Sequence, residues 1–168
     1  TPLRGNVDTR LRKLAEGEFD AIILALAGLR RLGREAVVSQ ILDESFMVPA
    51  IGQGGLGIAC RTNDSAVMDR LSKLDHQPTR LAVTAERGLL AILEGSCKVP
   101  IAGHARTTEG QIVLKGLVAN LSGTVVIAGQ MSGPPNNARD LGIALGKDLL
   151  SRGAGATLAE ISQHGTSR

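Results

Sequence analysis

The sequence of 168 residues has almost no aromatic side chains: it contains no Trp and no Tyr, and its two Phe residues are Phe19 and Phe46. Proteins that bind single-stranded nucleic acid stack the bases on aromatic side chains, so this class of protein is excluded. Membrane-spanning proteins have aromatic residues at the interfaces and apolar runs of about 18 residues or more, and this sequence has neither. We therefore expect no nucleic acid and no membrane among its partners.

Cysteine and histidine are scarce as well, with two Cys and three His residues. This number is too small for a disulfide framework, and no pair has the spacing of a zinc site, so we predict no metal site. Cys60 lies in an apolar run and is expected to be buried and inert. Cys97 follows Gly95 and Ser96 and precedes Lys98, surroundings that favour a thiolate. The spacing shows no histidine and third residue that would complete a catalytic triad with Cys97. From spacing alone, Cys97 is therefore a weak candidate for a nucleophile.

Arginine is the abundant cation, with 14 Arg residues against 5 Lys, although the net charge is only +3. The guanidinium group binds carboxylates and phosphates through two parallel hydrogen bonds, which a lysine ammonium cannot do. Six of the arginines lie in the first 34 residues. Composition leaves two interpretations open: a solvated basic face, or a pocket for a ligand rich in carboxylates or phosphates.

The hydrophobic pattern predicts a change of architecture along the chain. In the first part, a helix from Asn6 to Gly17, a strand buried on both faces at 19–25 and a helix at 27–32 are typical of an α/β sheet. After one further helix, the pattern from about residue 77 predicts a small α+β domain in which two helices accompany a three-stranded antiparallel sheet. These later elements are helices at 65–74 and 79–93, strands at 99–105, 111–120 and 124–130, and a helix at 137–150.

A glycine-rich segment, Gly52–Gly57, formally matches the dinucleotide fingerprint G-x-G-x-x-G. That motif requires a strand before it and a helix after it. Here Pro49 precedes the segment and a strand-like run, Ile58–Cys60, follows it, so we reject dinucleotide binding. The segment is then either a crossing between two domains or a loop whose amides, together with Gln53, contact a ligand.

Glu86 and Arg87 lie next to each other in the middle of a predicted helix. Neighbouring residues point to different faces of a helix, so they do not form one ion pair. We expect a structural role for them at a contact between domains. Asp140 and Asp148, on the last predicted helix, are expected to be solvated.

Five segments together are more specific than any one of them: Leu3–Leu11, Phe19–Gly33, Pro49–Arg61, Ala85–Arg87 and Leu93–Ile101. In this order and spacing they resemble the porphobilinogen deaminase family, also called hydroxymethylbilane synthases. The resemblance extends from Thr1 to about Glu160.

The resemblance implies an enzyme of three domains, the first two similar to periplasmic binding proteins, of which this chain is the C-terminal half. Residues 1–48 would be the later part of the second, α/β domain, and 49–76 an interdomain loop with a returning segment of the first. Residues 77–168 would be the α+β domain that carries the cofactor. The chain begins without Met, which also suggests that sequence is missing upstream. We expect a cytoplasmic protein that is monomeric when complete.

The resemblance further implies a dipyrromethane cofactor joined to Cys97 by a thioether bond. On this primer the family condenses four porphobilinogen units head to tail, with loss of ammonia, and hydrolysis releases hydroxymethylbilane. The family's essential aspartate lies in the missing N-terminal half, so no catalytic residue is assignable in this chain. As an isolated chain it could alternatively be a non-catalytic module that binds anions or carries the cofactor. The implied cofactor-binding residues are Cys97, Arg4, Arg10, Arg31, Gln53, Gly54 and Ser96.

Overall fold

The computed structural model describes residues 3–93 and 100–165, and the chain divides into two units, Thr1–Asp43 and Glu44–Arg168. The first unit contains α1 (Val7–Ala15), α2 (Leu26–Arg31) and the short 3₁₀ helix η1 (Glu35–Val37). The side chain of Asn6 accepts a hydrogen bond from the amide of Thr9 (2.8 Å) and so caps α1. Both helices predicted in this unit are confirmed.

The buried strand predicted at 19–25 does not form, and this prediction is wrong for this chain. Residues 21–25 have no regular secondary structure, and Ile23 is 66% exposed. A strand needs a neighbour for its backbone hydrogen bonds, and the described part of the first unit contains no other strand. The strand expected around Ile58–Cys60 is absent too, and Cys60 is exposed rather than buried.

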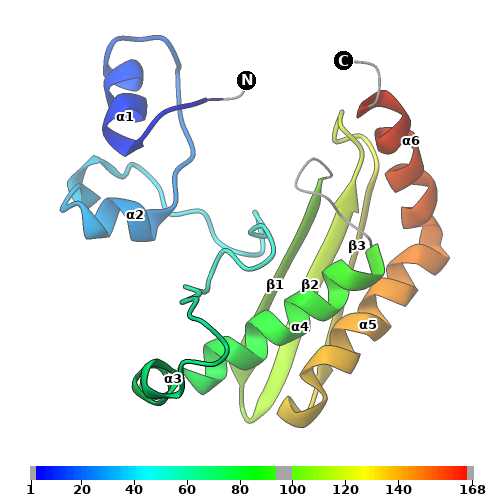
Figure 1. The fold of residues 1–168 in the computed structure, drawn as a ribbon. Helices are drawn as coiled ribbons and strands as arrows, with labels where there is room; N and C mark the ends of the chain where they lie inside the picture. Colours follow the sequence, from blue (N-terminus) through cyan, green and yellow to red (C-terminus); the bar gives the residue numbers. More distant parts are fainter. Residues whose placement is uncertain (1–2, 94–99, 166–168) are drawn as a thin grey trace. The chain divides into compact units, whose positions relative to one another are not determined.

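The second unit is built on a three-stranded antiparallel sheet of order β1-β2-β3, which confirms the predicted α+β domain (Figure 1). The strands are β1 (Ile101–Thr108), β2 (Gln111–Ala119) and β3 (Val126–Gly133). Glu109 and Gly110, both with positive φ (52° and 74°), connect β1 to β2, as a two-residue hairpin with right-handed strand twist requires. One face of the sheet provides buried side chains, among them Ile112, Leu114 and Val118.

Two helices cover this face: α4 (Gln77–Leu93) and α5 (Ala138–Leu149) lie side by side across the sheet (Figure 1). Ala85, Leu89 and Leu93 of α4 and Leu145 and Leu149 of α5 form the core with the strands. The remaining elements are α3 (Ser65–Ser72), η2 (Pro135–Asn137), the π-helical turn η3 (Leu150–Ala154) and α6 (Gly155–Gly165). The sequence analysis did not predict α6.

A row of glycines crosses the sheet beneath these helices. Gly103 of β1 pairs with Gly116 of β2, and Gly116 pairs in turn with Gly129 of β3. A Cβ atom at Gly116 would lie only 2.6 Å from a methyl group of Leu89 and 3.1 Å from one of Leu145. The row is therefore a furrow into which Leu89 and Leu145 fit, and it accounts for three of the 21 glycines in the sequence.

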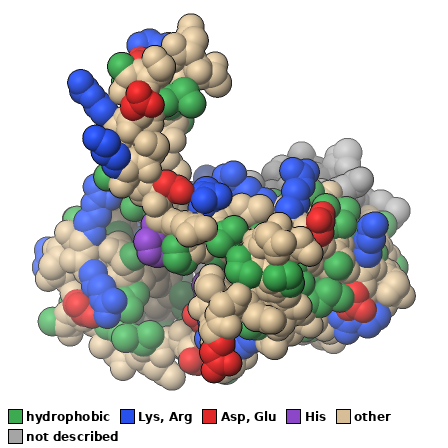
Figure 2. Space-filling view, turned by 90° about the horizontal axis from the view of Figure 1, so that it is seen from below, with side chains coloured by type: hydrophobic (Ala, Val, Ile, Leu, Met, Phe, Trp, Pro, Cys, Tyr) green, Lys and Arg blue, Asp and Glu red, His purple; other side chains and the backbone are tan. Residues whose placement is uncertain are grey.

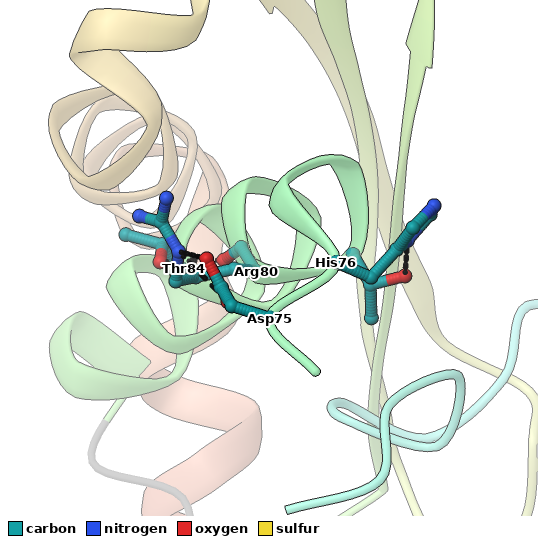
Figure 3. Close-up of polar contacts among 5 residues, drawn as sticks. Asp75, His76, Arg80 and Thr84 are labelled. Atoms are coloured by element: carbon teal, nitrogen blue, oxygen red, sulfur yellow. Dashed lines mark hydrogen bonds and ion pairs between the residues drawn. The ribbon is translucent and has the colours of Figure 1, made fainter. Parts of the chain in front are cut away.

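Polar contacts define where α4 begins (Figure 3). Asp75, before the helix, accepts hydrogen bonds from Nε of Arg80 at 2.9 and 3.1 Å, and Nδ1 of His76 lies 2.8 Å from the hydroxyl of Thr79. One turn further on, the hydroxyl of Thr84 donates to the carbonyl of Arg80. These contacts fix the first turns of the helix that provides much of the core.

Hydrophobic side chains also reach the surface, where they are interspersed with charged ones (Figure 2). Phe46 and Leu56 are the most exposed large apolar residues described, and Leu56 is 96% exposed. None of the helices in the described ranges is both long enough and apolar enough to span a membrane.

Candidate functional site

The beginning of the glycine-rich segment is attached to β1 and α4 within the second unit. The carbonyl of Pro49 accepts a hydrogen bond from the amide of Gly103 (3.0 Å), and Ile51 packs on the core above Gly103. A turn follows, closed by a hydrogen bond from the amide of Gln53 to the carbonyl of Ala50. We call residues 50–55 the glycine turn.

Glycine is needed at two positions of the glycine turn. Gly52 has a φ of +75°, a left-handed conformation that other residues rarely adopt. At Gly55 a Cβ atom would lie 2.9 Å from a methyl group of Val83 and 3.6 Å from one of Thr79, so only glycine lets the turn pack this closely on α4. Gln53 and Gly54, between them, are both exposed.

The carboxylate of Glu86 connects the glycine turn to the sheet. One oxygen accepts a hydrogen bond from the amide of Gly52 (2.7 Å), and the other accepts one from the amide of Ala105 (2.9 Å). The Glu86 side chain is only 3% exposed, whereas its neighbour Arg87 is exposed. The two residues therefore point to different faces, as predicted, and both oxygens of the buried carboxylate are satisfied by backbone donors.

His104 lies between two carboxylates. Its Nε2 is 3.1 Å from Glu44 and its Nδ1 is 3.7 Å from Glu86, while the second oxygen of Glu44 lies 3.5 Å from Arg106. The Nδ1 atom is buried and has no hydrogen-bond partner in the described part of the chain. A polar network thus runs from Arg106 through Glu44 to His104, and Nδ1 of His104 faces Glu86 without a hydrogen bond.

A hollow of about 230 Å³ lies beside this network. Gly54 contributes to its wall from the glycine turn, Glu86 from α4, and His104 and Arg106 from β1. The rest of its wall consists of Pro78, Thr79, Ala82, Val83, Ala105 and Thr107. The exposed part of the glycine turn therefore lies at a concave surface of the second unit.

The six arginines in the first 34 residues fall into two groups. Three form ion pairs with surface carboxylates: Arg12 with Glu16, Arg30 with Glu35 and Arg34 with Asp8. The hydrogen bond that Arg12 donates to the carboxylate of Glu16, together with the negative charge of Glu16, raises the pKa of Arg12. The other three have no carboxylate partner within the ranges that the structure describes: Arg4, Arg10 and Arg31.

These three arginines are placed differently in the first unit. Arg4 precedes α1 and is exposed, and Arg31 is exposed in the last turn of α2. Arg10, in α1, is half-buried, and its Nε donates a hydrogen bond to the carbonyl of Gly5 (2.8 Å). No hydrogen bond or ion pair joins any two of the three among the described residues.

The other predicted cofactor-binding residues, Ser96 and Cys97, lie in the segment 94–99, outside the described residues. Sequence reasoning missed the contributions of Glu44 and His104 and the partners of Glu86. One signal was present for Glu86. It lies four residues after Ala82 and three before Leu89, on the apolar face of α4, where an acidic side chain requires a partner.

Comparison with known proteins matches both parts of the chain to one family. Residues 1–69 match the family model described as "Porphobilinogen deaminase, dipyromethane cofactor binding domain", and residues 80–151 match "Porphobilinogen deaminase, C-terminal domain". Porphobilinogen deaminase from Nitratidesulfovibrio vulgaris strain DSM 19637 / Miyazaki F is 51% identical over 164 residues, which are 95% of this chain and 52% of that protein. The enzyme from strain Hildenborough is also 51% identical, over 97% of this chain and 52% of its own length.

The matched family is one of transferases. The chain belongs to the porphobilinogen deaminase family, and it spans about half the length of the curated relatives it matches. The resemblance inferred from the sequence motifs is thereby confirmed.

Proposed function

We propose that this chain is the C-terminal half of a hydroxymethylbilane synthase, an enzyme that condenses four porphobilinogen molecules head to tail with loss of ammonia and releases hydroxymethylbilane by hydrolysis. The family match supports this proposal. So does the arginine pattern within the first 34 residues: the three arginines expected to hold the ligand are those without a carboxylate partner in the described ranges, whereas Arg12, Arg30 and Arg34 are paired.

The residues present fit dipyrromethane, which, when bound, supplies the pyrrole end to which new units are added. Each of its rings bears carboxylates, and guanidinium groups bind carboxylates through two parallel hydrogen bonds. Arg4, Arg10 and Arg31 would hold these groups, and Cys97 would form the thioether bond. The exposed Gln53, with Gly54 at the hollow, would contact the same ligand from the glycine turn.

The domain assignment inferred from the resemblance belongs to this proposal. Residues 1–48 represent the later part of a second domain similar to periplasmic binding proteins, and 49–76 a connection with a returning segment of the first. Residues 77–168 form the cofactor-carrying domain. In this arrangement porphobilinogen, the growing oligopyrrole and the N-terminal half of the enzyme are the partners, and the complete protein is a cytoplasmic monomer.

A second candidate is a non-catalytic module that carries the cofactor or binds anions. The length of the match supports this candidate, because the chain aligns with only 52% of the length of each relative. No acidic residue of this chain is assigned the role of the family's catalytic aspartate. The synthase and the carrier differ in turnover and not in the cofactor, whereas a module that only binds anions would lack both.

The test is a chimera in which the N-terminal half of the Nitratidesulfovibrio vulgaris enzyme precedes this chain. We expect the chimera to consume porphobilinogen and to carry, by intact mass, an adduct of two pyrrole units. Cys97→Ala should lose the adduct, and the matched variant Cys60→Ala should retain it. An adduct without turnover would favour the carrier. An unmodified, inactive chimera would refute the synthase and the carrier and leave only anion binding.

A further inference from the structure

Glu86 holds together three segments that are distant in sequence. The residue belongs to α4, and its carboxylate binds the amide of Gly52 in the glycine turn and the amide of Ala105 in β1. Because the side chain is 3% exposed, water does not replace either bond. Hydrogen bonds to a buried charged group are stronger than those between neutral groups, so the three segments are rigidly linked at this point.

The bond to Gly52 acts on the residue directly before Gln53. Other contacts fix the glycine turn on either side of this point: Pro49 is bonded to β1, and Gly55 packs on α4. The left-handed φ of Gly52 sets the direction in which the chain continues to Gln53 and Gly54. The carboxylate of Glu86 therefore determines where the exposed part of the turn is presented.

The same helix leads to the cofactor cysteine. Glu86 lies seven residues before Leu93, the last residue of α4, and Cys97 follows four residues later in the sequence. The element that precedes Cys97 is thus the element that holds the glycine turn. A single rigid connection between them limits how far the turn and the helix can shift relative to each other.

We propose that Glu86 is a positioning residue, which aligns Gln53 and Gly54 of the glycine turn with the helix that leads to Cys97. This inference rests on the proposed function and deepens it. Glu86 touches neither cofactor nor substrate in this role; it acts through the amide of Gly52. Misplacement of a ligand-contacting group by about 1 Å is sufficient to lower turnover strongly.

Two substitutions in the chimera separate positioning from simple stabilisation. Glu86→Gln keeps the size of the side chain but replaces one acceptor oxygen by an NH₂ group, so one of the two amide bonds is lost. Gly52→Ala leaves Glu86 intact and strains the turn through its φ of +75°, while its Cβ would meet no atom within 4 Å. The matched control is Glu109→Gln, an exposed glutamate in the β1–β2 turn.

The variants are compared well below their unfolding temperatures, by kcat and KM for porphobilinogen, by the fraction carrying the adduct, and by amide hydrogen exchange at Gly52 and Ala105. We expect about tenfold or greater loss of kcat or of adduct fraction in both Glu86→Gln and Gly52→Ala. We also expect faster exchange of at least one of the two amides in Glu86→Gln. Glu109→Gln should match the wild type in all respects.

The outcomes are distinct for the two proposals. An active, adduct-bearing wild-type chimera beside folded Glu86→Gln and Gly52→Ala variants with unchanged kinetics and adduct would refute the positioning role alone. A lower unfolding temperature of the Glu86→Gln variant with unchanged kcat, KM and adduct fraction would show that Glu86 only stabilises the fold. That result would refute the positioning role as well. A wild-type chimera with neither adduct nor turnover would refute the proposed function, and the positioning role with it.

Discussion

Gly142 of α5 lies directly against the backbone of Ala85 in α4. A Cβ atom at Gly142 would overlap the carbonyl oxygen of Ala85 and would lie 2.6 Å from the amide nitrogen of Leu89. At the same crossing, a Cβ atom at Gly88 would overlap the carbonyl of Arg139. The two helices therefore meet backbone to backbone. The atoms that an added methyl group would strike belong to the backbone, so no side-chain rotation could make room for it.

Gly142→Ala should destabilise the second unit, since the added methyl group can be accommodated only if α4 and α5 move apart. We expect the free energy of unfolding to fall by at least about 2 kcal/mol. Chemical denaturation monitored by circular dichroism measures the change. Gly57→Ala is the control, because a Cβ atom there meets nothing within 4 Å. Equal stability of the two variants would show that the crossing is looser than described.

The glycine furrow in the sheet yields a prediction of coupling. Gly116→Ala places a methyl group 2.6 Å from Leu89, which is fully buried, and should cost about 1–3 kcal/mol. Leu89→Ala leaves a cavity and should cost about 2–5 kcal/mol. Because the new methyl group fills part of that cavity, the double variant should be less destabilised than the sum of the two changes. Strict additivity in a double-mutant cycle would contradict this packing.

Arg10 offers a test of carboxylate binding in the chimera. Its Nε is bonded to Gly5, and no carboxylate of the described chain engages the rest of its guanidinium group. Arg10→Lys retains the charge but loses the two-bond geometry, so we expect KM for porphobilinogen or the fraction of adduct to change by about tenfold.

The control for this experiment is Arg70→Lys, because Arg70 is an exposed arginine in the last turn of α3. It should leave the kinetics unchanged. If Arg10→Lys also behaves as the wild type, Arg10 belongs to a solvated basic face and not to a ligand site.

Local patterns were sufficient to predict the three-stranded sheet of the second unit and the two helices that cover it, α4 and α5. The alternation along Gln111–Ala119 and the helical spacing along Ala138–Leu149 reflect faces that are buried within this chain, so the sequence carries the information locally. The apolar run at 19–25 has an equally clear pattern, yet it forms no strand. A strand depends on hydrogen bonds to a neighbour, and the pattern of one segment does not contain that neighbour.

The site was predicted less completely than the fold. The motif identified Gln53 and Gly54 as ligand-contacting candidates, and the acidic residue at position 86 was noticed. Its two bonds were not, because Gly52 and Ala105 are 34 and 19 residues away and backbone donors leave no trace in the choice of side chain. The contact of Glu44 with His104 joins residues 60 positions apart and is equally invisible to local reasoning.

The contacts along the outer side of β1 have a consequence for self-association. Strands at the rim of a sheet expose unpaired amides that can recruit a strand from another molecule and so begin aggregation. In β1, the amide of Gly103 donates a hydrogen bond to the carbonyl of Pro49, and the amide of Ala105 donates one to the carboxylate of Glu86. Pro49, directly before the glycine turn, and the buried carboxylate of Glu86 therefore protect this rim. A molecule that loses either contact exposes an unpaired strand edge and also misplaces the turn.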